Sequence, residues 1–342
     1  MGDVRVGKSL FPKFPVRRFG RHLGWVAAIA AAACAQQALA SEGGASLYLL
    51  GSGGPGAAEM PPLKGVFLDN EAYYYKGSAK GDKQFLVGGN LVAGLDATIV
   101  ADFPTVLWVP TTNFAGGTLA IGGAVPVGEP SVDVSAVLTG PLGNQFGVSA
   151  SDSKLVIGDP IATAALGWKH GDLHIQASTI VNIPIGQYRE GQLANLAFHR
   201  WAGDASLAMT WNDGKSGWDV TGKAGFTFNG KNDDTDYTTG TEFHLEGSIE
   251  KKLSKTWSAG LQAYYFDQVS GDTGSGATLG SFKGEVTGVG VTAAHSFILG
   301  KMPASLRFRA FTEFDAKNRL EGNSVWLGLS LPLSMKMPPG AH

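Results

Sequence analysis

The segment SLRFRAFTEFD, residues 305–315, shows the pattern that decides the fold class. Successive side chains of an extended strand point to opposite faces, so Leu306 and Phe308 share one face while Arg307 and Arg309 share the other. The face that carries two arginines cannot lie against lipid, whereas the opposite face is apolar. A wall between lipid and water requires this alternation, which is typical of a transmembrane β-barrel.

The same alternation recurs through the second half of the chain. In WSAGLQAYY, residues 257–265, Trp257 and Leu261 share a face opposite Gln262. Repeating segments predict about twelve strands, at residues 65–76, 84–109, 117–126, 161–168, 172–184, 203–212, 218–228, 241–251, 256–267, 281–298, 304–315 and 322–333. A further hairpin within residues 127–160 would raise the count to about 14. We therefore predict an all-β chain that forms a transmembrane antiparallel up-and-down β-barrel; alternation taken alone also fits a soluble β-sandwich.

The connections between these strands are alternately short and long. The short ones are residues 169–172, 212–217, 253–255 and 299–304, and the long polar ones are residues 185–202, 229–240 and 268–280. Bacterial outer-membrane barrels have short periplasmic turns and longer outside loops. An even number of strands returns both chain ends to the periplasmic side. The pattern predicts a barrel in the outer membrane of a Gram-negative bacterium, in contact with outer-membrane lipid.

Tryptophan placement favours the membrane as well. Five of the eight tryptophans border a short connection, namely Trp108, Trp168, Trp211, Trp218 and Trp257. Indole rings prefer the lipid headgroup interface, where the apolar body and the polar N–H are both accommodated. These five residues are predicted to form an aromatic girdle at the turn rim; the alternative is that they are ordinary core aromatics at strand ends.

The N-terminal residues resemble a secretion signal. Six basic residues in the first 22 positions precede the apolar run LGWVAAIAAAACAQQ and then Ala38-Leu39-Ala40. This order predicts a signal peptide over residues 1–40, which contains the single cysteine, Cys34. The apolar run is too short for a membrane anchor, because a helical span needs about 20 residues. A lipoprotein signal at Cys34 is a weaker alternative.

The remaining chain divides into an irregular N-terminal part, a barrel and a tail. Residues 41–63 are rich in glycine and irregular, and are interpreted as a plug, a periplasmic arm or a flexible lead-in. Residues 64–333 are predicted to form the barrel, and residues 334–342 are predicted to form a C-terminal tail. Without residues 1–40 the chain keeps 21 basic and 28 acidic residues, a formal charge of about −7. This charge argues against nucleic acid as a partner.

No catalytic or metal-binding constellation stands out. The chain lacks a nucleophile elbow, a His-Glu-x-x-His helix and a phosphate-binding loop. His174 and His244 fall on predicted lumen faces, and a serine lies near His244 only along the strand. Asp233, Asp234 and Asp236 lack the spacing of a calcium loop and are interpreted as solvated charge. We therefore expect neither enzymatic activity nor a metal or cofactor.

Charged residues on the predicted lumen faces are the candidates for pore lining. They are Arg307, Arg309, Glu313, Glu242, His244 and Glu246. In a channel, such residues set ion selectivity, so replacing Arg307 and Arg309 by alanine would favour cations. The alternative is that the arginines pair with acids such as Glu242 and Glu246 and only fill the lumen.

Several landmarks between residues 158 and 333 resemble one family. They are Gly158-Asp159-Pro160, NIPIGQY at 182–188, FNGKNDDTDYTTGTEFH at 228–244, GLQAYYFDQVSGDTGSG at 260–276 and EFDAKNRLEGNSVWL at 313–327. Together they resemble the transporter-like outer-membrane family "MetA-pathway of phenol degradation", including its SphA-like branch. The resemblance implies passive uptake of small hydrophobic or aromatic compounds without a catalytic site. A structural or surface-interaction barrel without a transport role is the alternative.

The last predicted strand also resembles an assembly signal. Gly328 is followed by Leu331 and Leu333, as in the motif that the barrel-assembly machinery reads. The chain departs from that motif because it continues through SMKMPPGAH, residues 334–342, and does not stop at a terminal aromatic residue. The resemblance implies the barrel-assembly machinery as a partner.

Overall fold

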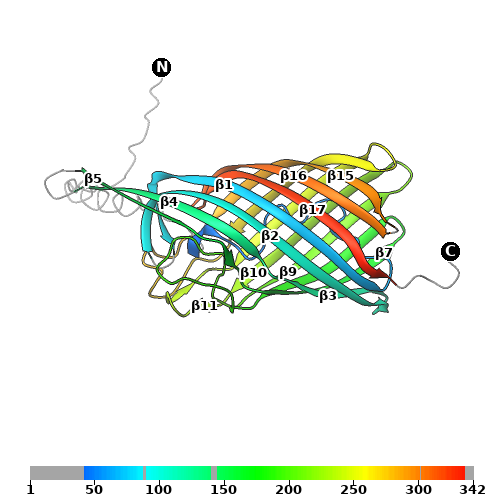
Figure 1. Cartoon of the computed structure of the whole chain (residues 1–342), viewed down its shortest axis with the longest axis horizontal. Coiled ribbons are helices and arrows are strands. Elements are labelled where there is room, and N and C mark those ends of the chain that lie inside the picture. The colour runs from blue at the N-terminus through cyan, green and yellow to red at the C-terminus, as the bar shows by residue number, and fades with distance from the viewer. Residues whose placement is uncertain (1–41, 88–89, 140–144, 301, 336–342) are drawn as a thin grey trace, which may run out of the picture. The chain divides into compact units, whose positions relative to one another are not determined.

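A computed structural model of the chain describes residues 42–87, 90–139, 145–300 and 302–335 (Figure 1). The predicted signal peptide, Cys34 and most of the predicted tail lie outside the described residues. Strands dominate the described residues, and the one helical element is η1, a 3₁₀ turn at Glu42–Gly44. Within this part of the chain, no helix is both long and apolar enough to cross a membrane.

Twelve strands of the described residues close into one antiparallel ring. They are β1 (Gly65–Val87), β2 (Asn90–Phe114), β3 (Gly117–Ala124), β7 (Ile161–His170), β8 (Leu173–Asn182), β9 (Ala202–Asp213), β10 (Trp218–Asn229), β13 (Glu242–Lys252), β14 (Trp257–Gln268), β15 (Glu285–Leu299), β16 (Met302–Lys317) and β17 (Glu321–Met335). Strand β1 pairs with β2 on one side and with β17 on the other, which closes the ring. Closure leaves no unpaired strand edge in lipid. The predicted twelve-stranded barrel is confirmed, and a β-sandwich is excluded.

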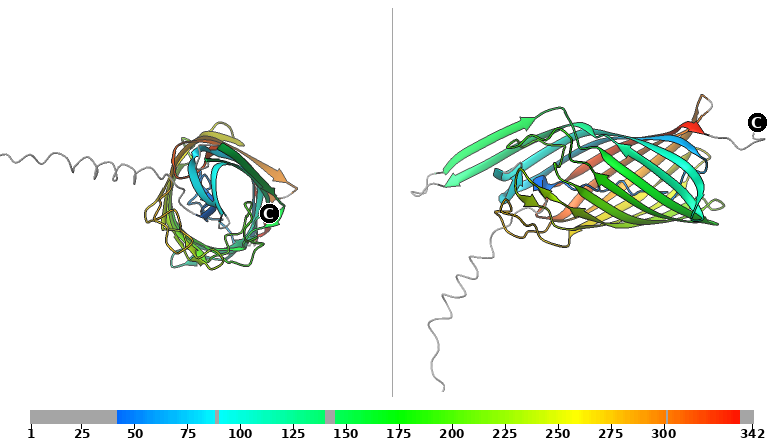
Figure 2. Two further views of the ribbon diagram at one scale, coloured as in Figure 1. Left: turned by 90° about the vertical axis from the view of Figure 1, so that its left-hand side faces the viewer. Right: turned by 90° about the horizontal axis from the view of Figure 1, so that it is seen from below.

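The alternative hairpin in residues 127–160 exists but lies outside this ring. It consists of β4 (Val127–Thr139), β5 (Gln145–Ser153) and the short β6 (Val156–Ile157). Strand β2 pairs with β3 through residues 105–114 and with β4 through residues 95–102. The hairpin therefore extends the wall along β2 and projects beyond one rim of the barrel (Figures 1 and 2). It does not raise the strand count of the ring.

The barrel is apolar outside and polar inside. Along β13, Glu246, Ser248 and Glu250 are buried, while Leu245 and Ile249 are exposed. On β14, Leu261 is 61% exposed and its neighbour Gln262 only 3% exposed. This distribution is the reverse of a water-soluble protein, and it requires lipid around the wall. The two predicted faces of these strands are confirmed.

Tight turns and tryptophans gather at the rim opposite the long loops, which we name the turn rim. Gly116, Gly171, Gly217 and Gly300 adopt positive φ angles there, a conformation that costs glycine little. The five predicted girdle residues lie on strands beside these turns, and all except Trp168 are classed as exposed. The Trp168 indole donates a hydrogen bond to the Ala115 carbonyl, 3.0 Å away. Their role as a headgroup girdle stays a prediction.

The opposite end, which we name the loop rim, carries the longer connections. Residues 183–201 join β8 to β9, and residues 269–284 join β14 to β15. The connection from β10 to β13 includes a small hairpin, β11 (Lys231–Asn232) with β12 (Tyr237–Thr238). Residues 42–63, which we name the inner segment, lie within the barrel (Figure 2), and hydrogen bonds join them to inward-facing side chains of several strands.

Candidate functional site

Glu246 holds the inner segment by its backbone. Its two carboxylate oxygens accept hydrogen bonds from the amides of Gly51, at 2.8 Å, and Gly53, at 2.9 Å. The side-chain amide of Gln262 donates to the same carboxylate and to the carbonyl of Gly51. A Cβ at Gly53 would lie 2.7 Å from the Tyr48 hydroxyl, so a larger residue there would force buried side chains to move. The glycines that make the segment look flexible in sequence allow it to fit closely against the wall.

Arg309 secures the segment from β16, three strands along the wall from the strand of Glu246, β13. Its guanidinium donates to the carbonyls of Gly51, at 3.0 Å, and Ser52, at 3.2 Å. It also forms an ion pair with Glu71 and lies over the Trp326 ring. Only 2% of Arg309 is exposed. This predicted pore-lining residue is therefore a binding partner of the inner segment.

His244 also meets the inner segment. Its ring stacks on Tyr48 with 3.5 Å between centroids. The same nitrogen, Nε2, contacts Asp204 at 2.9 Å and Ser206 at 3.3 Å. A catalytic triad needs the acid on one ring nitrogen and the nucleophile on the other. The geometry is therefore that of a buried polar cluster and not of a hydrolytic site.

On the turn-rim side of the inner segment lies a cavity of about 1080 Å³. Arg307 and Glu250 line this turn-side cavity and form an ion pair of 2.6 Å. The sequence suggested Glu242 and Glu246 as partners for the arginines, which is wrong: Arg307 pairs with Glu250 and Arg309 with Glu71. Closing the barrel brings strands from distant parts of the chain across from one another, and alternation along one strand does not reveal those pairs.

The two arginines therefore have separable roles, and we expect Arg307→Ala alone to shift ion selectivity. Removing the cation leaves Glu250 facing the turn-side cavity, so the zero-current potential in a planar bilayer should move toward cation preference. The matched control is Lys317→Ala, which breaks a 2.7 Å ion pair with Glu285 at the loop rim. Equal potentials in the two variants would show that Arg307 does not line the ion path.

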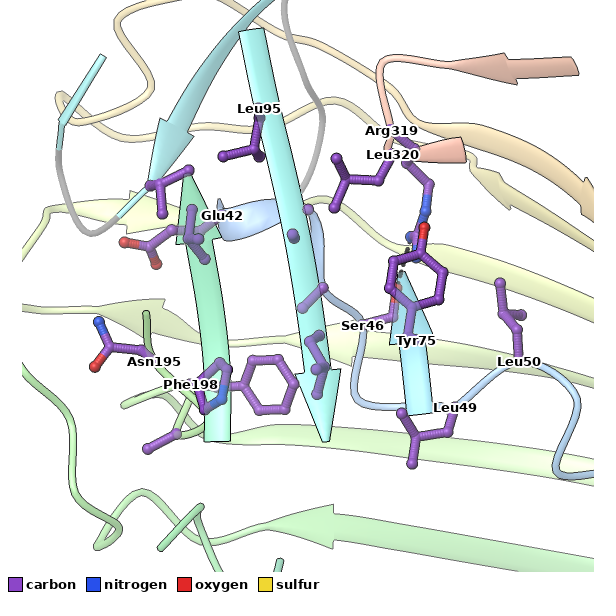
Figure 3. Close-up of a pocket in the computed structure, with 18 of the residues that line it drawn as sticks. Glu42, Ser46, Leu49, Leu50, Tyr75, Leu95, Asn195, Phe198, Arg319 and Leu320 are labelled. Carbon is purple, nitrogen blue, oxygen red and sulfur yellow. Dashed lines mark hydrogen bonds between the residues drawn. The ribbon is translucent and has the colours of Figure 1, made fainter. Parts of the chain in front are cut away.

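On the loop-rim side of the inner segment lies a smaller cavity of about 170 Å³, which we name the loop-side cavity (Figure 3). Its walls come from the inner segment, from β1, β2, β4, β14 and β16, from residues 183–201 and from the turn between β16 and β17. Six aromatic residues line it, namely Tyr48, Tyr73, Tyr75, Tyr188, Phe198 and Tyr264. The sequence did not identify these residues as a group, because four elements far apart in the chain contribute them.

Glu313 fixes two of these aromatic rings. Its carboxylate accepts hydrogen bonds from the hydroxyls of Tyr75, at 2.9 Å, and Tyr264, at 3.0 Å. The amide of Gly322 donates to it as well, at 2.9 Å. The predicted pore-lining Glu313 thus lines the loop-side cavity but is engaged with its wall.

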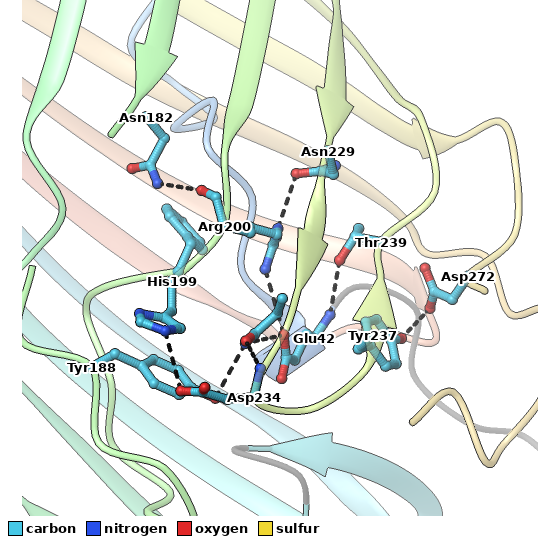
Figure 4. Close-up of polar contacts among 12 residues, drawn as sticks. Glu42, Asn182, Tyr188, His199, Arg200, Asn229, Asp234, Tyr237, Thr239 and Asp272 are labelled. Carbon is cyan, nitrogen blue, oxygen red and sulfur yellow. Dashed lines mark hydrogen bonds and ion pairs between the residues drawn. The ribbon is translucent and has the colours of Figure 1, made fainter. Parts of the chain in front are cut away.

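The other end of this cavity is polar (Figure 4). A nitrogen of Arg200, Nη1, lies 3.7 Å from the Glu42 oxygen Oε2, and Arg200 Nε donates to Asn229. The same Glu42 oxygen accepts a 3.0 Å hydrogen bond from Asn232. Tyr188 lies nearby and stacks on His199; burial and the charge of Glu42 raise the pKa of Tyr188 to about 12.

The landmark residues hold this end of the cavity together. The buried carboxylate of Asp159 accepts hydrogen bonds from the side chain of Asn182 and from the amides of Gly186 and Phe198. It thereby fixes residues 183–201 against the end of β8. Gly186 cannot be larger, because a Cβ there would lie 2.5 Å from the Gly158 backbone. The first two landmarks of the sequence are therefore one structural unit.

The loop acids do not form a metal site. Lys231 pairs with Asp233 and Asp236, while Asp234 pairs with His199. Among the described residues, no group of three or more His, Cys, Asp or Glu side chains is arranged to hold a metal ion.

The chain matches a known family model. The model is described as "Putative MetA-pathway of phenol degradation", and it matches residues 81–329. The chain belongs to this family. No match was found among curated proteins. The landmarks at 158–160 and 182–188, which carried the resemblance, lie within the matched range.

One solved structure has a similar fold, and two others match with lower TM-scores. The COG4313 outer membrane channel from Pseudomonas putida F1 has a TM-score of 0.62 and 18% identity, over 81% of this chain and 98% of that chain. The translocator domain of the autotransporter NalP from Neisseria meningitidis has a TM-score of 0.42 and 11% identity, over 80% and 88%. A FadL homologue from Pseudomonas aeruginosa has a TM-score of 0.38 and 11% identity, over 84% and 94%. With the closed ring and the apolar outer face, the likeness to the first of these shows the fold of a Gram-negative outer-membrane β-barrel.

Proposed function

We propose that this barrel is a passive outer-membrane channel for small apolar compounds, aromatic ones in particular. The aromatic loop-side cavity supports the proposal most directly. It provides an apolar site for a small molecule in a lumen that is lined by many buried polar side chains. Binding sites for small molecules are concave and mostly apolar, with a few polar groups that set orientation. A cavity of about 170 Å³ suits one ring, since an apolar cavity of about 150 Å³ in another protein binds benzene.

We further propose that the inner segment closes the lumen between the two cavities. It lines both of them, with Tyr48 and Leu49 on the loop side and Ser52 and Gly56 on the turn side. Its contacts with Glu246 on β13 and Arg309 on β16 come from two different strands of the wall. A compound in the loop-side cavity would reach the turn-side cavity only when this segment moves out of the lumen. Outer-membrane lipid surrounds the barrel, and the barrel-assembly machinery remains a proposed partner.

Filling the loop-side cavity is expected to stop uptake. Ala97 lines the cavity and is buried, so Ala97→Phe places a ring where the compound would rest. Uptake of radiolabelled toluene by intact Gram-negative cells should fall to the rate of cells without the protein. The control is Ala72→Phe, which adds the same ring to an exposed position of β1.

Intact cells are needed because apolar compounds cross simple lipid vesicles unaided. Both variants must reach the outer membrane in equal amounts and migrate as folded barrels before boiling. If the parent protein gives no uptake above that of cells lacking it, the protein would instead be a structural or surface-interaction barrel. If Ala97→Phe transports as well as Ala72→Phe, the path does not use this cavity.

A further inference from the structure

The turn rim carries an excess of positive charge. Three of its turns, with the strand residues beside them, contain five lysines and two aspartates, a formal excess of three positive charges. These turns are residues 169–172, 213–217 and 251–256. The three long connections of the loop rim, residues 183–201, 230–241 and 269–284, contain four basic and five acidic residues. Because bacterial barrels place their short turns toward the periplasm, the positive charge lies beside the periplasmic leaflet of the membrane.

The turn-rim lysines form no ion pairs with the described residues. The five are Lys169, Lys215, Lys251, Lys252 and Lys255. Ion pairs of the described residues include lysines of the loop rim, Lys231 and Lys317, but none of these five. Asp213, the nearest acid along the chain to Lys215, accepts its backbone amide at 2.9 Å. The charge of the five lysines is therefore available to an anion from outside the chain.

Four of the five lysines lie on two neighbouring turns. The amide of Lys252 donates to the carbonyl of Gly217, at 2.8 Å, and so joins the turn between β13 and β14 to the turn between β9 and β10. Lys215 lies on the second of these turns, and Lys251, Lys252 and Lys255 lie at the first. Lys215, Lys252 and Lys255 are exposed. Four positive charges are thus concentrated on one part of the rim.

Lys251 is held at the level of the predicted tryptophan girdle. Its ammonium lies over the Trp218 ring, 4.7 Å from the centroid, and donates a hydrogen bond to the Ser216 carbonyl. An ammonium has three N–H donors, so two remain for another acceptor. Trp218 and Trp257, on β10 and β14 to either side of β13, are both exposed. Indole rings prefer the depth of lipid headgroups, which places this ammonium beside lipid phosphates.

We propose that this part of the rim binds the headgroup of an anionic phospholipid in the periplasmic leaflet. Its surface, which we name the lysine surface, consists of Lys215, Trp218, Lys251, Lys252 and Lys255. A lysine near an anionic membrane surface contributes roughly a fivefold preference for it, and these four lysines act at one place. The lysine surface lies outside the lumen, so the inference does not depend on transport through the barrel.

The wall next to the lysine surface suits the acyl chains of such a lipid. Val220, Ile249 and Leu261 follow it along β10, β13 and β14, they pair with one another across the strands, and all three are exposed apolar residues. A free phosphate has no chain to lie on this strip. A soluble periplasmic partner would contact the turns but not the lipid-facing wall. A ligand that uses both the charge and the strip therefore has an anionic head and an apolar tail.

Native mass spectrometry of the purified full chain in detergent tests the inference. The protein is mixed with equal amounts of phosphatidylglycerol and phosphatidylethanolamine that have the same acyl chains, and bound lipids are identified by mass. The parent protein should bind the anionic phosphatidylglycerol at least about tenfold more than the zwitterionic lipid, since two lysines already exceed that factor. The preference should fall as the salt concentration rises, because salt screens exposed charges.

Two double variants with equal loss of charge locate the site. Lys251→Gln combined with Lys255→Gln should reduce the preference for phosphatidylglycerol by at least about tenfold. The control combines Lys231→Gln with Lys317→Gln, which removes the same charge from the loop rim and should keep the preference. Migration of the unboiled proteins on a denaturing gel checks that both fold. Should the first not fold, Lys215→Gln combined with Lys252→Gln replaces it.

Each outcome bears on the inference. A preference that is lost only in the turn-rim variant supports it. Equal binding of the two lipids by the parent protein, or the same preference in the two double variants, overturns it. Glycerol phosphate in large excess should not displace phosphatidylglycerol, and displacement would show a phosphate site that needs no lipid, which also overturns the inference. None of these results changes the proposed channel, which the uptake of toluene tests separately.

Discussion

Replacing Leu261 with arginine is expected to destabilise the barrel by about 2–4 kcal/mol, the range for a basic residue at the bilayer midplane. Leu261 is exposed on the outer face of β14, and it pairs with Ile249 on one side and Val291 on the other. These neighbours are exposed as well, so they form an apolar band in which a guanidinium finds neither water nor a carboxylate.

Urea unfolding of the protein in lipid vesicles measures this cost. Leu261→Phe is the matched control, because it changes shape but keeps an apolar side chain toward lipid, and its stability should stay close to that of the parent. If Leu261→Arg unfolds at the same urea concentration as Leu261→Phe, this face does not meet the hydrocarbon of the membrane.

The contrast with Gln262 shows what alternation along a strand can predict. The period of two placed Leu261 outside and Gln262 inside, and the structure agrees. From the sequence alone, however, Gln262 faces an open lumen, where a larger side chain would be tolerated. Its amide instead donates to Glu246 and to the carbonyl of Gly51, so Gln262→Arg would disturb the inner segment. The direction of a side chain follows from local geometry, but its partner does not.

The inner segment could not be placed from the sequence for a related reason. A run such as GSGGPG, residues 51–56, has the composition of a flexible linker. Only the wall around it, with Glu246 on β13 and Arg309 on β16, selects one conformation. Plug, arm and lead-in are therefore indistinguishable until the barrel has closed around them.

Aromatic packing beside the loop-side cavity was visible in the sequence. In SLRFRAFTEFD, Phe311 falls on the face of the arginines and so breaks the alternation. Phe311 is buried in the lumen, where it packs against Tyr264 at 5.2 Å. Trp326 also points inward and packs against Tyr73. Aromatic residues on a polar barrel face thus indicate aromatic packing inside the barrel, although they do not show which loops complete it.

Replacing Glu246 with alanine is expected to open the lumen. The carboxylate accepts the amides of Gly51 and Gly53, so its loss leaves two buried N–H groups without an acceptor, at about 1–3 kcal/mol each. Arg309 and Gln262, which donate to the carbonyls of Gly51 and Ser52, then retain this part of the inner segment. Because the segment lines both cavities, its release should connect them and raise the single-channel conductance in a planar bilayer above that of the parent protein.

The matched control for this variant is Glu250→Ala, which removes the same charge from the same inward face of β13. Glu250 bonds to Ser258 and Arg307 and has no hydrogen bond to the inner segment among the described contacts, so its loss should change selectivity more than conductance. Hydrogen exchange gives a second measure, since the amides of Gly51 and Gly53 should exchange faster only in Glu246→Ala. Equal conductance in the two variants, with the same exchange rates, would mean that the inner segment does not depend on Glu246 and that another contact closes the lumen.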